Sequence, residues 1–242
     1  YVDYTGKKLQ YVDKASGEVV EVEVFVGILP CSGYTFVEAS ASQQLPHFIG
    51  SMNNCLRFFG GSPQAIVPDN LKSAVTKGSK YEPTLNKSFK DFAVHYGTVI
   101  NPTRTYSPQD KALVEGAVKL VYQRIFYPIS QMTFFSLVEL NEEIKLRLIV
   151  YNDYLLSLLL LSRKQQFLTI EQVFLSPLPA EDYELKTYRK ATVQKMGYVF
   201  LSEDKNYYSV PFRFIGKKVE VSYDYQNVFV SYNNERIASH PR

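Results

Sequence analysis

The sequence predicts an α/β fold, a mixed five-stranded sheet flanked by helices, followed by a small all-β barrel domain. Three observations predict it. Alternating β-branched runs fill the first forty residues, helical and short apolar runs then alternate, and closely spaced short strands follow residue 186. The 242 residues are 45% hydrophobic, enough to build one or two cores. We expect a first domain over 1–176, with a helical extension from about residue 130, and a barrel over 186–242.

The first forty residues predict three strands joined by tight turns. Strands are expected over 1–12, 18–29 and 34–41, and the middle one, EVVEVEVFVGIL, has the clearest alternation. The turns at 13–17 and 30–33 each contain a glycine, which adopts positive φ at no steric cost. Three consecutive strands joined in this way predict an antiparallel meander.

Helices and strands then alternate. From 45 to 59, apolar residues recur every three or four positions, as in an amphipathic helix. Ser107-Pro108-Gln109-Asp110 has the N-cap serine, first-turn proline and acid that start a helix. The further predicted elements are a strand at 64–67 ending at Asp69, a helix at 87–96, a strand at 98–101, a helix at 107–126 and another from about 136. This order is that of the ribonuclease H-like fold.

The last third of the chain predicts a helix, a linker and a β domain. The most apolar run, YLLSLLLL at 154–161, is shorter than the ~20 residues of a membrane helix, so we expect a buried helix there. The proline-containing stretch at 177–185 predicts a linker. The strands expected beyond it are 191–195, 198–202, 207–212, 217–223, 227–232 and 235–240, which suit a small barrel.

Charge and cysteine content limit the possible functions. The net charge is +3, but residues 186–242 carry ten Lys/Arg against five Asp/Glu, which suits an arm that touches phosphates. Ordinary surface lysines would look the same. Two cysteines cannot form a cysteine-based zinc site alone, and we expect both to be reduced. The three histidines lack zinc-ligand spacing, and neither a Walker-type loop nor a G-x-S-x-G elbow occurs.

Three acidic residues suit two-metal phosphoryl transfer. That chemistry needs carboxylates converging on one point, because hard divalent cations prefer oxygen ligands and two of them clamp the attacking and leaving oxygens. Asp3 lies in the first predicted strand, Asp69 ends the fourth, and Glu115 lies on the helix after the fifth. We expect the first and fourth strands to be neighbours at the centre of the sheet.

Each acid also has a simpler interpretation. Asp3 is equally compatible with an exposed strand end, and Asp69 with a Pro-Asp-Asn turn. Glu115 is flanked by Lys111 and Lys119 at helical spacing, a surface pairing worth about 0.2–0.5 kcal/mol per pair. The residues alone leave both interpretations open.

Basic side chains near the acids and in the C-terminal segment are candidates for binding DNA phosphates, although ordinary solvation is the alternative. Phosphate contacts position a protein on DNA without reading the sequence. The candidates are Lys72, Arg104, Lys111 and Lys119 near the acids, and Arg189, Lys190, Lys217 and Lys218 in the C-terminal segment.

Many segments resemble the IstA transposases of bacterial insertion sequences. The most specific are VPDNLKSAV at 67–75 and DKALVEGAV at 110–118, and VDYTG at 2–6 also matches. The other matching segments follow in the same order: VFVGILPCSGYTFVEA (24–39), RFFGG (57–61), KYEPTLNKSF (80–89), HYG (95–97), FFSLVELNEEI (134–144), SRKQQF (162–167), SPLPAEDYEL (176–185), YYSVPFRFIGKKVEV (207–221) and RIASH (236–240). The resemblance covers essentially the whole chain.

The resemblance implies a branch of the retroviral-integrase superfamily with a ribonuclease H-like core. The family's catalytic acids fall on Asp3, Asp69 and Glu115, which would bind Mg²⁺, with Mn²⁺ as a substitute. The implied reactions are 3′-end cleavage of insertion-sequence DNA and strand transfer to target DNA. The implied partners are double-stranded DNA (transposon ends and target), further copies of the chain on that DNA, and a helper ATPase of the IstB type, with no membrane. The C-terminal part resembles the small barrel of phage Mu-type transposases.

Two departures from the family and two other functions complete the predictions. IstA proteins carry N-terminal helix-turn-helix regions that this sequence does not contain, so we expect a fragment. The family's polar segment before SRKQQF is replaced by YLLSLLLLS at 154–162.

The other functions are a non-catalytic DNA-binding or assembly module, and a nuclease acting on RNA–DNA hybrids. We expect a bacterial cytoplasmic, nucleoid-associated protein.

Overall fold

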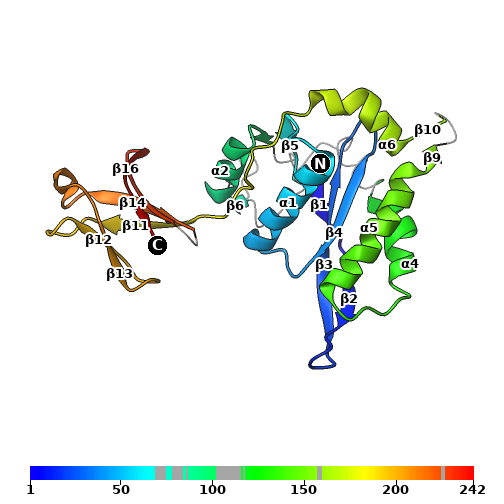
Figure 1. The fold of residues 1–242 in the computed structure, drawn as a ribbon, viewed down its shortest axis with the longest axis horizontal. Helices are drawn as coiled ribbons and strands as arrows, with labels where there is room; N and C mark the ends of the chain where they lie inside the picture. Colours follow the sequence, from blue (N-terminus) through cyan, green and yellow to red (C-terminus); the bar gives the residue numbers. More distant parts are fainter. Residues whose placement is uncertain are drawn as a thin grey trace. The chain divides into compact units, whose positions relative to one another are not determined.

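The computed structural model of the protein describes residues 1–68, 75–77, 84–85, 87–101, 116, 118–156, 160–224 and 227–242. Within these ranges the chain forms two compact units, residues 1–183 and 184–242, which we treat separately (Figure 1). None of the helices in the described ranges combines the length and the apolar character that a membrane crossing requires.

The first unit is built on an antiparallel sheet. Its strands are β1 (Val2–Tyr4), β2 (Leu9–Val12), β3 (Val19–Ile28) and β4 (Thr35–Ser40). β1 and β2 pair with successive parts of β3, and β4 pairs with β3 as well. The predicted strand over 1–12 is therefore interrupted at residues 5–8. The Thr5 N–H still donates to the Val24 carbonyl of β3 at 2.8 Å, and the Thr5 hydroxyl donates to the Lys7 carbonyl at 2.7 Å within the turn that separates β1 from β2. The predicted meander is confirmed.

Two short parallel strands extend this sheet beyond β1. They are β5 (Ala65–Ile66) and β8 (Val99–Ile100), which pair in parallel. An isolated parallel bridge between Val2 and Pro68 joins them to β1. The resulting order, β4-β3-β1-β5-β8, is the mixed five-stranded order that the sequence predicts. A further hairpin, β6 (Val75–Lys77) with β7 (Thr84–Leu85), was not predicted.

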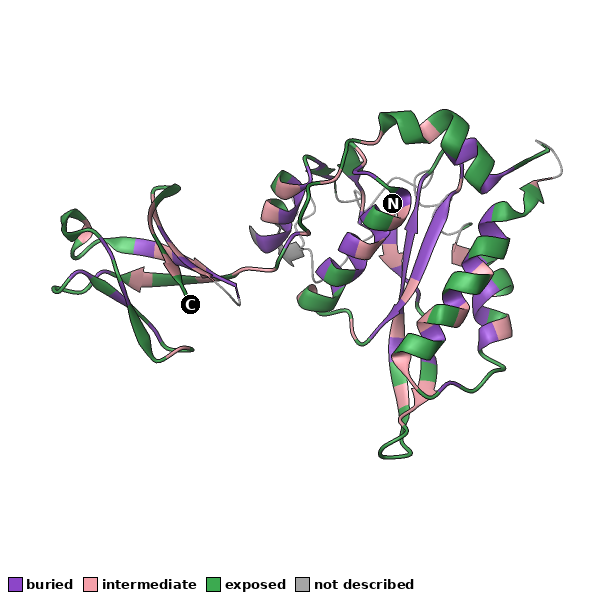
Figure 2. Ribbon diagram, viewed as in Figure 1, coloured by how far each residue is buried: buried purple, intermediate pink, exposed green. Residues whose placement is uncertain are grey.

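Helices lie on both sides of the sheet (Figure 1). On one side are α1 (Leu45–Phe59) and α2 (Lys87–His95), both as predicted. Their aromatic rings form the core with the sheet: Phe48 lies 6.0 Å from Phe25 of β3 and 5.2 Å from Phe89 of α2, centroid to centroid. Figure 2 shows that β3 and β4 are buried along most of the length facing these helices.

The helix α5 (Leu137–Asp153) lies on the other side and caps the edge strand β4. As predicted, it begins at Ser136. The Ser136 hydroxyl accepts the Glu139 N–H at 3.1 Å and caps the helix. The amides of Asn141 and Asn152 each make two hydrogen bonds to the β4 backbone, at Ala39 and Thr35, with lengths of 2.8–3.1 Å. Two asparagine side chains thereby satisfy polar groups of an edge strand that would otherwise invite pairing with another chain.

One prediction for the end of this unit is wrong. The apolar run at 154–161 is not a buried helix: β9 (Leu155–Leu156) pairs with β10 (Leu161–Ser162), and Leu155 is 58% exposed. Apolar residues occupy almost every position of this run instead of recurring every three or four residues, so a single helix could not turn all of them toward one core. The predicted linker at 177–185 contains no helix or strand, and the boundary between the two units falls within it. Its part up to Tyr183 packs on the first unit: the Tyr183 hydroxyl donates to the Ser88 carbonyl at 2.9 Å, and the Tyr183 carbonyl accepts from the Asn53 amide.

Four short helical segments also belong to this unit, one before α5 and three after β10. They are α4 (Tyr127–Ile129), α6 (Arg163–Gln166), η2 (Phe167–Glu171) and η3 (Gln172–Phe174). Ser162 caps α6 by accepting the Gln165 N–H, and the Gln165 side chain accepts the Ser162 N–H in return, a capping box.

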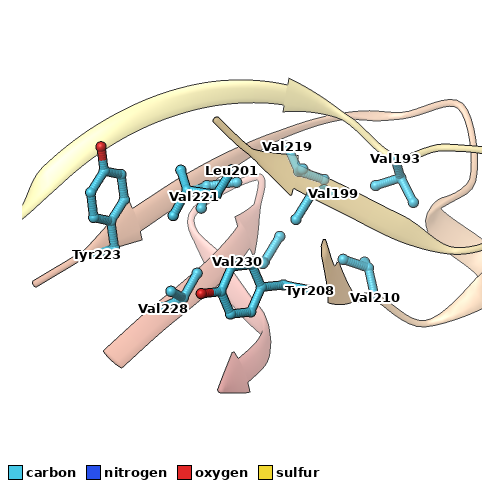
Figure 3. Packing of buried hydrophobic residues seen from close by; sticks show 10 residues of the cluster. All are labelled: Val193, Val199, Leu201, Tyr208, Val210, Val219, Val221, Tyr223, Val228 and Val230. Carbon is cyan, nitrogen blue, oxygen red and sulfur yellow. The ribbon is translucent and has the colours of Figure 1, made fainter. Parts of the chain in front are cut away.

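The second unit is all-β. A four-stranded antiparallel sheet has the order β11 (Thr187–Thr192), β14 (Lys218–Tyr223), β15 (Asn227–Tyr232) and β16 (Glu235–Pro241). A hairpin of β12 (Tyr198–Leu201) and β13 (Asn206–Ser209) covers one face, and the turn η4 (Phe212–Phe214) follows. Figure 3 shows the buried side chains, mostly valines such as Val221 and Val230, gathered between these strands.

The predicted strands of this unit are present, with two differences. The first runs over 187–192 instead of 191–195, because the chain turns at Gly197, whose φ of +76° favours glycine. Among the described residues the strands form a sheet and a separate hairpin, and no closed ring of strand pairings is seen where we expected a barrel.

Candidate active site

Asp3 lies in β1 between two buried residues. Val2 and Tyr4 are 5% and 6% exposed, and the Tyr4 ring meets Phe25 edge-on at 5.6 Å. Successive side chains of a strand point to opposite faces, so Asp3 projects away from that aromatic core. It is half-buried, and its Oδ1 accepts the Tyr4 N–H at 2.8 Å. The carboxylate is therefore oriented by the strand that carries it.

Backbone pairing brings the chain before Asp69 next to the chain before Asp3. The Val2 N–H donates to the Val67 carbonyl at 3.0 Å, and Val2 and Pro68 form the parallel bridge. Both chains run in the same direction at this point, and Asp3 is the next residue of β1. Asp69, which follows Pro68 in the sequence, lies outside the described residues.

A helix packs against the chain that follows β1. Residues 118–121 are α-helical and continue into η1 (Tyr122–Phe126), a π-helical turn of a kind that is frequent at functional sites. The Lys7 ammonium lies over the Tyr122 ring, 5.0 Å from its centroid. Burial raises the pKa of Tyr122, while the Thr5 hydroxyl and the Lys7 backbone act in the opposite direction. Tyr122 thus holds this helix against the segment after β1.

The structure describes only part of the predicted site. Glu115, Lys72, Arg104 and Lys111, like Asp69, lie outside the described residues. Lys119 is described and is exposed on the helix one turn before Tyr122. Within the described ranges, no three His, Cys, Asp or Glu side chains lie close enough to share a metal ion.

The sequence is similar to those of named transposases. It is 40% identical over 240 residues to a putative transposase of Sinorhizobium fredii, covering 99% of this chain and 46% of that protein. It is 33% identical over 242 residues to the putative transposase for insertion sequence IS408 of Burkholderia multivorans, covering 100% of this chain and 46% of that protein. The chain belongs to the insertion-sequence transposases. It spans about half the length of the curated relatives it matches.

More distant comparisons agree with this transposase assignment. Residues 178–242 match the family described as Mu transposase, C-terminal domain. The catalytic core domain of BIV integrase superposes with a TM-score of 0.51 and 10% identity, covering 71% of this chain and 95% of that one. A chain of the simian T-cell lymphotropic virus intasome structure superposes with a TM-score of 0.50 and 13% identity, covering 99% of this chain and 75% of that one. At these identities the likeness concerns the fold, and it confirms the ribonuclease H-like core.

The four basic residues predicted in the second unit of the transposase have different environments. Arg189 is paired with Glu203, its Nη2 lying 2.5 Å from Oε1. Lys190, the next residue, lies on the opposite face of β11 and shares a hollow with Lys218 of β14. Lys217 is exposed immediately before β14.

The sequence missed several residues that the tertiary structure places together. Tyr122 and Lys7 are in contact although they are far apart in the sequence, and no local pattern signals that contact. Lys186 and Arg236 flank the Phe229 ring at 5.0 Å and 4.3 Å, and nothing in their spacing along the chain signals it.

The cysteines are free thiols, and two of the histidines contact backbone carbonyls. Cys31 is exposed and Cys55 is buried, and both are free thiols, in agreement with the expectation of reduced cysteines. Burial raises the pKa of the Cys55 thiol, so it stays protonated and unreactive. The Nε2 atoms of His95 and His240 lie 3.0 Å and 2.7 Å from backbone carbonyls.

Proposed function

We propose that this chain is the catalytic portion of a DNA transposase that cleaves the 3′ ends of insertion-sequence DNA and joins them to target DNA. The observation that carries the proposal is the parallel contact between Val2 and residues 67–68. Because both strands run in the same direction there, the next residues, Asp3 and Asp69, start from neighbouring positions. Two carboxylates at the ends of adjacent central strands are what two-metal phosphoryl transfer requires.

Glu115 is proposed as the third carboxylate. It precedes Tyr122 by seven residues, and a helix with about 3.6 residues per turn that extended back over the predicted range 107–126 would carry both on one side. Tyr122 contacts the chain just after β1, under the Lys7 ammonium. We infer that Glu115 faces the same part of the sheet, on the side of Asp3.

Mg²⁺, or Mn²⁺ in its place, would be held by Asp3, Asp69 and Glu115. The described ligand fits: the Asp3 carboxylate is a hard oxygen donor, half-buried, and oriented by the Tyr4 N–H. When bound, divalent ions activate the attacking oxygen and neutralise charge that develops on the phosphate.

The reaction consists of two in-line displacements at phosphorus. In the first, a water oxygen bonds to phosphorus and the bond from phosphorus to the 3′-oxygen breaks. The cut strand is thereby divided into one fragment that ends in a 3′-hydroxyl and one that begins with a 5′-phosphate. In the second, that hydroxyl bonds to a target phosphorus and the target's own 3′-oxygen leaves. Each attacking oxygen loses a proton and each leaving oxygen gains one, with no oxidation or reduction. The protein's part is positioning.

The proposal extends to partners and location. Lys72, Arg104, Lys111 and Lys119 neighbour the acids in the sequence and would contact DNA phosphates. The transposase would act as a homo-oligomer on paired transposon ends and target DNA, with an IstB-type ATPase as helper. It would work at the nucleoid, in the bacterial cytoplasm.

A strand-transfer assay tests the proposal. The chain is incubated with Mn²⁺, a pre-cleaved transposon-end oligonucleotide and supercoiled plasmid, and joined product is measured. Asp69→Asn is compared with Glu142→Gln, an exposed acid of α5 that serves as the matched control. A catalytic metal supplies several kcal/mol and each ~1.4 kcal/mol is tenfold in rate, so Asp69→Asn should lose at least ~100-fold.

The outcomes separate the competing functions. Equal joining by wild type and Asp69→Asn would overturn the metal site. If neither this chain nor a longer form of the transposase joins DNA, while both bind it, the chain is a binding or assembly module. Cleavage of an RNA–DNA hybrid in a parallel reaction, without joining, would favour the nuclease.

A further inference from the structure

A pocket of about 420 Å³ lies between three parts of the first unit. One wall is the helix at 118–126, a second is α5 with its C-cap residue Tyr154, and a third is formed by β9 and the start of α6. Pockets that hold small molecules measure about 300–1,000 Å³, so this one is large enough for a ligand. None of its described lining residues belongs to the proposed catalytic site or to the basic residues proposed to contact DNA.

The walls of this pocket are mostly apolar. Leu120, Val150 and Leu156 supply aliphatic surface, and Tyr151 and Tyr154 supply ring surface. Leu120, Val150 and Tyr154 keep 39%, 70% and 56% of their surface exposed, although each has a large apolar side chain. Removing apolar surface from water is favourable, so these walls suit a ligand with an apolar body.

Two arginines reach the pocket without an acidic partner among the residues that the structure describes. The Arg124 guanidinium lies over the Tyr154 ring, 5.4 Å from its centroid. The Arg163 guanidinium lies 4.1 Å from the centroid of the Tyr151 ring, and its Nη1 donates to the Tyr151 carbonyl at 3.1 Å. A ring face and a carbonyl hold a guanidinium in place without neutralising its charge. Both cations are therefore positioned and still charged.

A third arginine of the pocket is already offset. Arg147 pairs with Glu143, one turn earlier in α5, with 2.7 Å between its Nε and the carboxylate Oε1. None of the described lining residues is itself acidic. The surplus positive charge of the pocket therefore comes from Arg124 and Arg163, and an anionic group would balance it.

We propose that this pocket binds an organic anion in which a carboxylate is attached to an apolar body. The body would lie against Leu120, Val150 and Leu156, and the carboxylate would pair with Arg124 and Arg163. A guanidinium matches the two oxygens of a carboxylate. A carboxylate has one charge to strip of water, whereas a phosphate monoester has nearly two, so the apolar walls favour the carboxylate.

The pocket also connects to the helix that contains Tyr122. Leu120 and Arg124 belong to this helix and face the pocket, on either side of the start of its π-helical turn. A ligand that touches both this helix and α5 would hold the two together. Binding itself needs neither DNA nor catalysis, so the inference does not rest on the proposed function.

The test measures ligand binding by NMR on the full chain, with isotope-labelled leucine and valine methyl groups. The probe is hydrocinnamate, and the matched control ligand is hydrocinnamamide, which has the same body without the charge. Hydrocinnamate should shift the methyl signals of Leu120, Val150 and Leu156. The amide should bind roughly tenfold more weakly or worse, because the charge-assisted hydrogen bonds to the guanidinium groups are lost.

Three variants test the charge of the pocket. Arg124 is exposed, so Arg124→Gln should fold and should weaken hydrocinnamate binding roughly tenfold while leaving the amide unaffected. The control is Arg213→Gln, which removes another exposed arginine, one that lies over the Phe214 ring at 4.9 Å in the second unit. Val150→Asp places a carboxylate in the pocket and should abolish hydrocinnamate binding.

The outcomes are decisive in both directions. Equal binding of hydrocinnamate and its amide, or equal binding by Arg124→Gln and wild type, would overturn the anion site. So would methyl signals that neither ligand shifts, or a duplex oligonucleotide that shifts them where hydrocinnamate does not. Tighter binding of acetyl-Leu-Phe, through its free C-terminal carboxylate, would assign the ligand to a peptide end, and tighter binding of hydrocinnamate would assign it to a small free acid.

Discussion

Gly27 marks a close approach between β3 and α1, and alanine at this position tests how rigidly the sheet holds Asp3. A Cβ built on Gly27 would lie 2.5 Å from Sγ of Cys55, well inside van der Waals contact. Cys55 is 1% exposed, so its sulfur cannot move into solvent. Gly27 is paired with Val2 on one side and with Phe36 on the other, so β3 cannot shift without disturbing both neighbours.

The expected cost follows from two opposing effects. Overpacking a well-filled core by one methyl group costs about 1–3 kcal/mol. Replacing glycine by alanine restricts the unfolded chain and returns about 0.4–1 kcal/mol. The free energy of unfolding of the Gly27→Ala variant should therefore fall by about 1–2 kcal/mol, which lowers Tm by about 2–8 °C for a unit of this size. Joining should fall as well, because Val2 and Asp3 are adjacent in β1.

The assay is a thermal melt of four proteins: wild type, Gly27→Ala, Cys55→Ala and the double variant. Removing the sulfur leaves room for the new methyl group, so the double variant should be more stable than the sum of the single effects predicts, by about 1 kcal/mol or more. Additivity within about 0.3–0.5 kcal/mol would refute the proposed contact. So would a Gly27→Ala variant as stable as wild type.

Two further predictions concern the helix that contains Tyr122 and the second unit. Tyr122→Ala removes the ring beneath Lys7 and should lower joined product by up to ~100-fold by displacing the helix. Tyr122→Phe keeps the ring and should keep most of the activity. Equal joining by wild type and both variants would contradict this role of Tyr122. The pKa of Glu203 is about 2, below its ordinary 4.5, through its own backbone hydrogen bond first and then Ser202 and Arg189. A carboxylate whose pKa is lowered by folding stabilises the fold above pH 4.5, and this stabilisation is lost as the pH falls toward 2. The Glu203→Gln variant should therefore show a smaller decline of Tm between pH 4.5 and 2 than wild type. An unchanged decline would count against the Arg189 pairing.

Local patterns in the sequence were sufficient for most elements. Alternation of β-branched residues predicted β3, and apolar spacing predicted α1, because both patterns reflect one buried face of a single element. The helix predicted from about residue 136 is α5, and Ser136 is its N-cap. The order of these elements was enough to predict the ribonuclease H-like sheet and to select three acids as candidates, and the resemblance to IstA proteins implied a catalytic role for them.

Only the tertiary structure decided matters that depend on pairing between distant segments. Arg189 and Lys190 are adjacent and equally basic, yet the register of β11 on β14 sends them to opposite faces, Arg189 toward Glu203 and Lys190 toward a hollow that Lys218 and Glu220 also line. The bridge from Val2 to Pro68 joins residues 66 positions apart, and no local pattern contains it. A residue's periodicity reports which side of its own element is apolar, whereas its partners are decided by how separate elements pack.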